Sequence, residues 1–134
     1  MIISKKSIGV SAENAVSKYF QSKGFKIISQ NYNVPRIGEL DLVCKDLDLL
    51  VYFIEVRYRS RIYKDSEVDQ LDLESIFSNF KRSKFIKISR LFAFDHNINF
   101  EKAKKLLVIV TTFVSCMVIS KVFDIETGEE ILMF

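Results

Sequence analysis

The sequence predicts a mixed α/β domain in which a mixed β-sheet is flanked by helices. A pattern with helical spacing opens the chain, and a second one lies beyond its middle. Three runs rich in apolar and β-branched residues lie between the two patterns, and further runs of that kind follow the second. The order helix, three strands, helix, strands is typical of a sheet with helices packed against it.

The first helix is bounded by two typical end residues. Ser7 is the predicted N-cap, and Gly24 is the predicted residue just after the C-terminal end. Between them an apolar stripe recurs at helical spacing, formed by Ala12, Ala15, Val16, Tyr19 and Phe20. Glu13 falls on the flank of that stripe, so we expect its carboxylate to reach the rim of whatever the helix covers.

Three strands are predicted after this helix, over residues 25–32, 39–45 and 49–57. Residues 33–36 form a loop between the first two, since Pro35 cannot belong to a central strand. Asp46-Leu47-Asp48 is the predicted turn between the second and third strands, which makes them an antiparallel hairpin.

The second half of the chain continues the alternation. A helix is predicted over residues 73–94, after an acidic stretch at 63–73 that we expect to be a mobile loop. Residues rich in Val, Ile and Phe predict two strands at 105–113 and 116–125, with no clear turn signal between them. Thr127-Gly128 indicates a late turn, followed by a last strand at 131–134.

Composition excludes several classes of protein. The chain has 134 residues, 49% of them hydrophobic, so we expect residues 1–134 to form a single domain with a real core. Two isolated cysteines and one histidine exclude a zinc site and a disulfide framework. No signal-peptide pattern opens the chain, and the longest apolar run, residues 106–119, is too short for a membrane span. We therefore expect a soluble, cytoplasmic protein that does not bind membranes.

The acidic residues of the predicted hairpin share one face, because side chains alternate along a strand. If the hairpin turns about Leu47, Asp41 lies opposite Phe53 and diagonal to Glu55, while Glu39 lies opposite Glu55. A shift of two residues instead puts Asp41 directly opposite Glu55. In both registers the acids lie within reach of one ion, and without a cation they would repel each other.

This pattern predicts metal-dependent phosphodiester chemistry. Mg²⁺ or Mn²⁺ is the predicted cofactor, with Asp41, Glu55 and the backbone carbonyl of Val56 as ligands, because Mg²⁺ takes a few carboxylates and keeps several waters. Arg57 points to the same face as Glu55 and would orient the attacking water. Glu13 would approach the same cluster from the first helix. The other interpretation of the two strand acids is a solvent-facing pair on an edge hairpin.

The run GELDLV, a short hairpin and then YFIEVRYR resembles the GEIDLI…FVEVKxR signature of the YraN-like uncharacterised proteins, which are predicted endonucleases. These belong to the PD-(D/E)xK nuclease superfamily and are similar to archaeal Holliday-junction resolvases. The matching positions are Gly24-Phe25, Asn31-Tyr32, Gly38-Glu39, Asp41, Glu55 and Arg59, with Glu13 as the helix acid and Lys81-Arg82 as the basic start of the second helix. The resemblance implies a restriction-endonuclease-like core, with Glu13, Asp41, Glu55 and Arg57 as catalytic residues acting on structured DNA.

Two positions depart from the family pattern. Arg57 stands where a lysine is usual, and Ala12 stands where a glycine often precedes the helix acid. Arginine keeps the positive charge, but its wide planar fork does not deprotonate and would position water differently. The alternative function is therefore a catalytically weakened nuclease fold that serves as a nucleic-acid- or protein-binding module. In that case Arg57 would only pair with Glu39 or Glu55.

Two basic clusters predict contacts with phosphates. Residues 81–90 carry five cations and no acid, and more arginines follow the third strand. The alternative for the helix cluster is an ordinary solvated surface. The residues predicted to bind nucleic acid, DNA in particular, are Arg59, Arg61, Lys81, Arg82 and Lys84. We also expect a homodimer, since symmetric cutting of two strands needs two sites.

Overall fold

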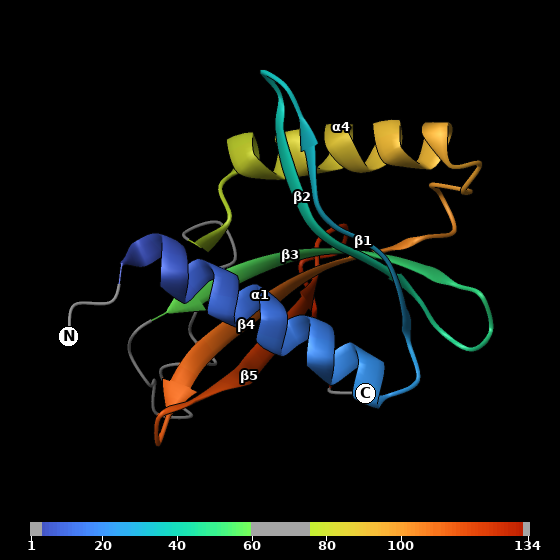
Figure 1. Cartoon of the computed structure of the whole chain (residues 1–134). Helices are drawn as coiled ribbons and strands as arrows, with labels where there is room; N and C mark the ends of the chain where they lie inside the picture. Colours follow the sequence, from blue (N-terminus) through green and yellow to red (C-terminus); the bar gives the residue numbers. More distant parts are fainter. Residues whose placement is uncertain (1–3, 60–75, 133–134) are drawn as a thin grey trace.

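A six-stranded sheet and two long helices make up the described part of the chain, residues 4–59 and 76–132 of this computed structural model (Figure 1). In chain order the elements are α1 (Lys5–Ser22), β1 (Lys26–Val34), β2 (Gly38–Lys45), β3 (Val51–Arg59), α4 (Asn79–Asp95), β4 (Lys104–Phe113), β5 (Cys116–Asp124) and β6 (Glu130–Ile131). The strands follow one another across the sheet, and only the β3–β4 pair is parallel. The predicted mixed α/β class is confirmed, with a restriction-endonuclease-like core.

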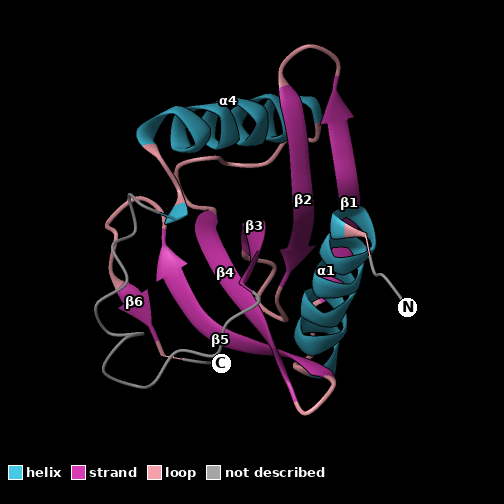
Figure 2. Ribbon diagram, turned by 90° about the vertical axis from the view of Figure 1, so that its left-hand side faces the viewer, coloured by secondary structure: helices cyan, strands magenta, loops and turns pink. Residues whose placement is uncertain are grey.

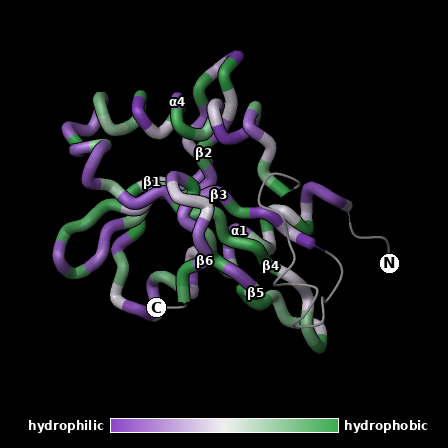
Figure 3. Tube along the Cα trace, turned by 180° about the vertical axis from the view of Figure 1, so that it is seen from behind, coloured by the Kyte–Doolittle hydropathy of each residue, from purple (hydrophilic) through white to green (hydrophobic). Residues whose placement is uncertain are grey.

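The two helices cover opposite faces of the sheet and create two hydrophobic cores (Figure 2). Phe20 of α1 packs with Ile54 and Val108, whereas Phe92 of α4 packs with Phe53. β4 lies between β3 and β5, and its largely hydrophobic chain is drawn mainly green in Figure 3. None of the helices in the described residues is long and apolar enough to cross a membrane.

β2 changes its orientation along its length. Leu40 packs in the core under α4, whereas Leu42 packs in the core under α1. Residues two apart in a regular strand share a face, so β2 must twist sharply about Asp41. Figure 1 shows the result, since the outer half of the β1–β2 hairpin rises beside α4 while its inner half crosses near α1.

The ends of α1 correct one prediction and confirm another. The N-cap is Ser4, whose hydroxyl oxygen accepts a hydrogen bond from the Ser7 backbone N–H at 3.1 Å. The prediction of Ser7 as N-cap was wrong, because a second serine three residues earlier allows the helix to begin sooner. Gly24 follows the C-cap residue Lys23 with φ +90°, as predicted for a residue just after the helix.

Hydrogen bonds in two turns explain why β1 and β3 have other ends than the predicted strands. β1 extends to Val34, because Pro35 lies just beyond it and Ile37 N–H closes the turn on the Val34 carbonyl at 3.1 Å. β3 starts at Val51 rather than 49, because the Asp46 carboxylate accepts from the N–H groups of Asp48 and Leu50 and widens the turn.

The β2–β3 hairpin has the shifted one of the two predicted registers. The paired residues run from Lys45 opposite Val51 to Leu42 opposite Ile54. One further step along this register brings Asp41 beside Glu55. The register with Asp41 opposite Phe53 was wrong, because the wider turn moves the third strand by two positions.

The second half agrees with the predicted order. α4 begins at Asn79, after the N-cap Ser78, so the predicted start at 73 is too early. Residues 73–75 and the whole acidic stretch at 63–73 lie outside the described residues. The β4–β5 turn is made by Val114 and Ser115, both with positive φ, and the predicted Thr127-Gly128 turn is confirmed by Gly128 at φ +76°. The last strand is Glu130–Ile131, earlier than the predicted 131–134, of which 133–134 lie outside the described residues.

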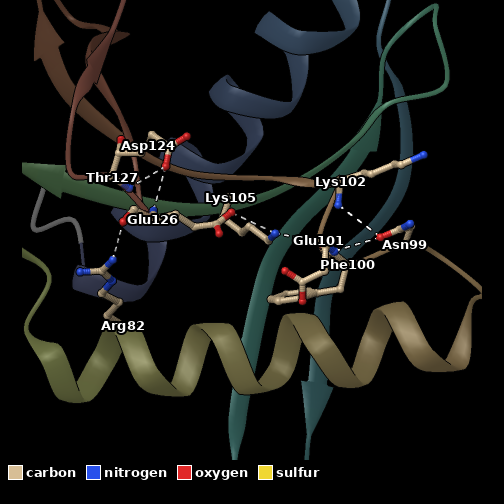
Figure 4. Close-up of polar contacts among 9 residues, drawn as sticks. All are labelled: Arg82, Asn99, Phe100, Glu101, Lys102, Lys105, Asp124, Glu126 and Thr127. Carbon is tan, nitrogen blue, oxygen red and sulfur yellow. Dashed lines mark hydrogen bonds and ion pairs between the residues drawn. The ribbon is translucent and has the colours of Figure 1, made fainter.

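A buried lysine joins the loop before β4 to the β5–β6 turn (Figure 4). Lys105 is fully buried, and its ammonium donates to the Phe100 carbonyl, lies 4.0 Å from the Phe100 ring centroid and lies 3.0 Å from Glu126 Oε1. Arg82 Nη2 of α4 donates to the Glu126 carbonyl at 2.9 Å. The cluster therefore fixes the β5–β6 turn against both α4 and β4.

We expect Glu126→Gln to lower the free energy of unfolding by about 1–2 kcal/mol, because the buried Lys105 ammonium would lose its anionic partner. Urea denaturation measures this change. Glu129→Gln, an exposed acid of the same turn, is the matched control and should be near neutral. Equal losses in the two variants would contradict the role of the Lys105–Glu126 pair.

Candidate functional site

Two carboxylates are buried side by side where β2 twists. Asp41 is 8% exposed and Glu55 is 7% exposed, and the hairpin register places them next to each other. Asp41 Oδ2 accepts a hydrogen bond from the Val56 backbone N–H at 2.9 Å across the two strands. This charge-assisted bond fixes the Asp41 carboxylate and makes it part of the sheet.

Arg57 lies directly against Glu55. Its Nη1 atom is 2.7 Å from Glu55 Oε1 and 3.3 Å from the Val56 carbonyl oxygen. Its guanidinium also lies 5.5 Å from the ring centroid of the buried Phe77. Of the two pairings considered for Arg57, the structure has the one with Glu55. A cation of the chain itself therefore touches two of the three predicted metal ligands.

Glu13 reaches the same place from α1. It is half-buried, and it lies within hydrogen-bonding range of Asp41 and of Asn31. With its amide nitrogen facing the carboxylates, Asn31 donates to Glu13 Oε2 and to Glu39 Oε1, both at 2.8 Å. Asn31 has φ +57°, a left-handed conformation that asparagine tolerates better than most residues. Its bridging role was missed by sequence reasoning, in which Asn31 appeared only as a position matching the family pattern.

Burial and mutual repulsion shift the proton affinities of these acids. The pKa of Glu13 rises to about 7, first because burial disfavours its charged form and then because Asp41 and Glu39 lie close; the Asn31 amide opposes the rise. The pKa of Glu55 is raised well above its usual value by burial and by Asp41, against the attraction of Arg57. Such shifts are typical of functional sites as well as of buried clusters.

The acids open into a hollow of about 260 Å³ between the hairpin and α4. Glu39, Asp41, Glu55 and Arg57 line one side, and Lys81 and Lys84 line the other. Gly38 also lines the hollow, and a side chain there would meet Ile88, since a Cβ atom would be 3.1 Å from Ile88 Cδ1. Cations of α4 therefore line the same hollow as the strand acids.

Not all the predicted phosphate-binding residues lie at this hollow. Arg59 ends β3 two residues beyond Arg57, and its Nη1 donates to the Tyr58 carbonyl at 2.9 Å. Arg82 lies on another face of α4 and bonds to the Glu126 carbonyl instead. Arg61 lies outside the described residues.

The donor set is small. Among residues 4–59 and 76–132, no group of three or more His, Cys, Asp or Glu side chains surrounds a point that could hold a metal ion. Asp41 and Glu55, with the Val56 carbonyl, supply the two carboxylates and one backbone oxygen of the predicted set. That set suits an ion such as Mg²⁺, which keeps several waters, rather than one that needs a full protein cage.

Known proteins resemble the chain over most of its length. Residues 12–125 match the uncharacterised protein family UPF0102. A UPF0102 protein of Natranaerobius thermophilus is 32% identical over 95 residues, 71% of this chain and 74% of the relative. One from Haemophilus influenzae is 31% identical over 99 residues, 74% of this chain and 76% of the relative. One from Psychromonas ingrahamii is 53% identical over 53 residues, 40% of this chain and 42% of the relative. No solved structure matches the chain significantly.

The raised pKa of Glu13 predicts a pH-dependent stability. Its folded-state pKa of about 7 lies above the ordinary 4.5, so its contribution to stability is complete below pH 4.5 and is lost as the pH rises through about 7. We expect Glu13→Gln to melt at a higher temperature than wild type at pH 8, with a smaller difference at pH 5, in thermal denaturation monitored by circular dichroism. Glu101→Gln, an exposed acid elsewhere, should show no such trend. A Glu13→Gln difference independent of pH would contradict the assignment.

Proposed function

The chain belongs to the uncharacterised protein family UPF0102, and on that premise we propose that it is an endonuclease dependent on Mg²⁺ or Mn²⁺ that acts on structured DNA. The observation that carries the proposal is the pair of buried, adjacent carboxylates Asp41 and Glu55 in a hollow whose opposite wall carries Lys81 and Lys84. A divalent cation would stabilise two adjacent buried acids, and two lysines that line the same hollow suit a phosphate.

Asp41, Glu55 and the Val56 carbonyl would hold the ion. The ion would supply a bound water of lowered pKa and a counter-charge for the scissile phosphate. The position of Arg57 supports this assignment, because its positively charged Nη1 atom already contacts Glu55 and the Val56 carbonyl, two of the proposed ligands. Asp41 keeps its other oxygen free of the bond to Val56 N–H, since that bond uses Oδ2 alone.

The remaining side chains would take distinct parts in the reaction. Glu13, with a pKa near 7, is suited to accept a proton from the attacking water at neutral pH. Arg57 would hold charge that develops on the phosphate, and Lys81 and Lys84 would position the DNA backbone. A homodimer would bring two such sites to the two strands, and the enzyme would work in the cytoplasm.

A second candidate function is favoured by the Arg57–Glu55 ion pair itself. The 2.7 Å contact satisfies Glu55 without any metal. A protein that keeps this pair closed would bind nucleic acid or a protein partner without cutting. Metal binding and cleavage therefore separate the two candidates.

We expect isothermal titration calorimetry with Mn²⁺ to show saturable binding to wild type and none to Asp41→Asn, because an amide is a weaker ligand than the carboxylate. Asp48→Asn, which changes an exposed acid of the β2–β3 turn, is the matched control and should bind as wild type does. Equal binding by wild type and Asp41→Asn would remove Asp41 from the proposed metal site.

Arg57→Lys should raise metal-dependent cleavage about tenfold, equivalent to about 1.4 kcal/mol of barrier, because a compact ammonium leaves more room for water at the carboxylates. Gel assays on four-way junctions and linear duplexes with Mg²⁺ or Mn²⁺ measure the rate. Adding Asp41→Asn to Arg57→Lys should abolish any cleavage gained and controls for contaminating nuclease. Absence of cleavage by wild type and Arg57→Lys alike would favour the binding module.

A further inference from the structure

A second groove adjoins the acidic hollow on the side of α1. Its volume is about 450 Å³, and its lining consists of Lys6, Gly9, Val10, Glu13, Asn31 and Glu39. Glu39 also lines the hollow between the hairpin and α4, so the two depressions share a wall. Together the two depressions form one path that runs from α4, past the acids, to the N-terminal half of α1.

The α1 side of this groove is one exposed helix face. Lys6, Gly9, Val10 and Glu13 recur at the spacing that places residues on the same side of a helix. Val10 is 47% exposed, and Lys6 is exposed. Glu13, at one end of this face, contacts Asn31 and Asp41, whereas Lys6 and Val10 face solvent.

Gly9 is not required by the fold. It lies in the interior of α1 and is not among the residues with positive φ. Apart from its chain neighbours and the nearby backbone of the helix, no described atom lies within 4 Å of the place a Cβ would take. Glycine at such a position destabilises a helix relative to alanine. Gly9 therefore costs helix stability and leaves room in the groove for a bound molecule.

We propose that a DNA strand lies in the groove along α1, with its backbone passing close over Gly9 and a phosphate held by Lys6. This rests on the proposed function, and it extends the DNA contact from α4 across the acids to a second rim. Cations lie at both ends of this path, Lys81 and Lys84 at one and Lys6 at the other, and the acids Glu13 and Glu39 lie between them.

The two acids that line the groove, Glu13 and Glu39, share a hydrogen-bond donor. Asn31 donates to both Glu13 and Glu39 at 2.8 Å, which offsets part of their negative charge. A phosphate above Gly9 would thus meet an amide and the Lys6 ammonium as well as the carboxylates.

Substitutions of Gly9 test the proposal, because they should move stability and affinity in opposite directions. Gly9→Ala and Gly9→Leu should both raise Tm, by roughly 2–4 °C, since alanine and leucine are better helix formers. DNA affinity should fall with side-chain size, by about tenfold for Gly9→Leu, equivalent to about 1.4 kcal/mol of binding free energy. The measurement is fluorescence anisotropy of a labelled four-way junction and a labelled duplex, with Ca²⁺ in place of Mg²⁺ to keep the DNA intact.

Lys6 gives an independent test of the phosphate contact. Lys6→Ala should weaken binding to both DNAs and lower the slope of log affinity against log salt by about one unit. Lys18→Ala removes a cation from a different face of α1 and is the matched control, with an unchanged slope.

The outcomes separate this inference from the proposed function. Wild type that binds DNA, together with a Gly9→Leu variant that is more stable but binds equally well, would overturn the groove along α1 and leave the proposed function standing. Wild type that binds neither DNA at low salt would overturn both. A stable Gly9→Leu variant with reduced affinity supports the groove, because misfolding cannot explain a loss that accompanies a higher Tm.

Discussion

The burial of Asp41 beside Glu55 is the constraint on which the rest of the site depends. Two carboxylates with exposures of 8% and 7% cannot both carry full charge next to each other without compensation. The chain compensates in three ways: the Val56 N–H donates to Asp41, Arg57 pairs with Glu55, and the pKa of Glu55 is raised. Each of these also bears on the proposed function, because each changes the negative charge that Asp41 and Glu55 would present to an ion.

The twist of β2 explains how one small sheet brings several elements to this pair. Leu40 and Leu42 pack on opposite sides of the sheet, so Asp41 lies between the layer under α4 and the layer under α1. From one layer α1 brings Glu13, and from the other α4 brings Lys81 and Lys84. A flat strand would have left Asp41 on one face, within reach of only one helix.

Sequence reasoning predicted the acids but not all of their surroundings. Strand alternation and the family resemblance were enough to select Asp41, Glu55 and Glu13, because those signals are local. The hairpin register remained open between two choices, since it depends on how the Asp46 side chain caps the turn. Arg82 was grouped with Lys81, although its guanidinium bonds to a carbonyl 44 residues further along the chain. Contacts that distant carry no signal in a single sequence. The Asn31 bridge spans fewer residues, but it too forms only when α1, β1 and β2 come together in the fold.

Arg57 links the two candidate functions, because its place is that of a competitor for the acids. The guanidinium contacts Glu55 and the Val56 carbonyl, the same groups that an ion would need. A divalent ion carries twice its charge but must lose part of its water shell, whereas Arg57 is already in place and rests on Phe77. If an ion were bound, Asp41, Glu55 and the Val56 carbonyl would hold it, and the Arg57 guanidinium would be free to pair with a phosphate. If no ion binds, Arg57 stays paired with Glu55, and Lys81 and Lys84 line a hollow that binds anions without catalysing a reaction. On the proposed function, an exchange of the Arg57 guanidinium for a bound ion would separate an enzyme that cuts from a module that only binds, with the same fold in both cases.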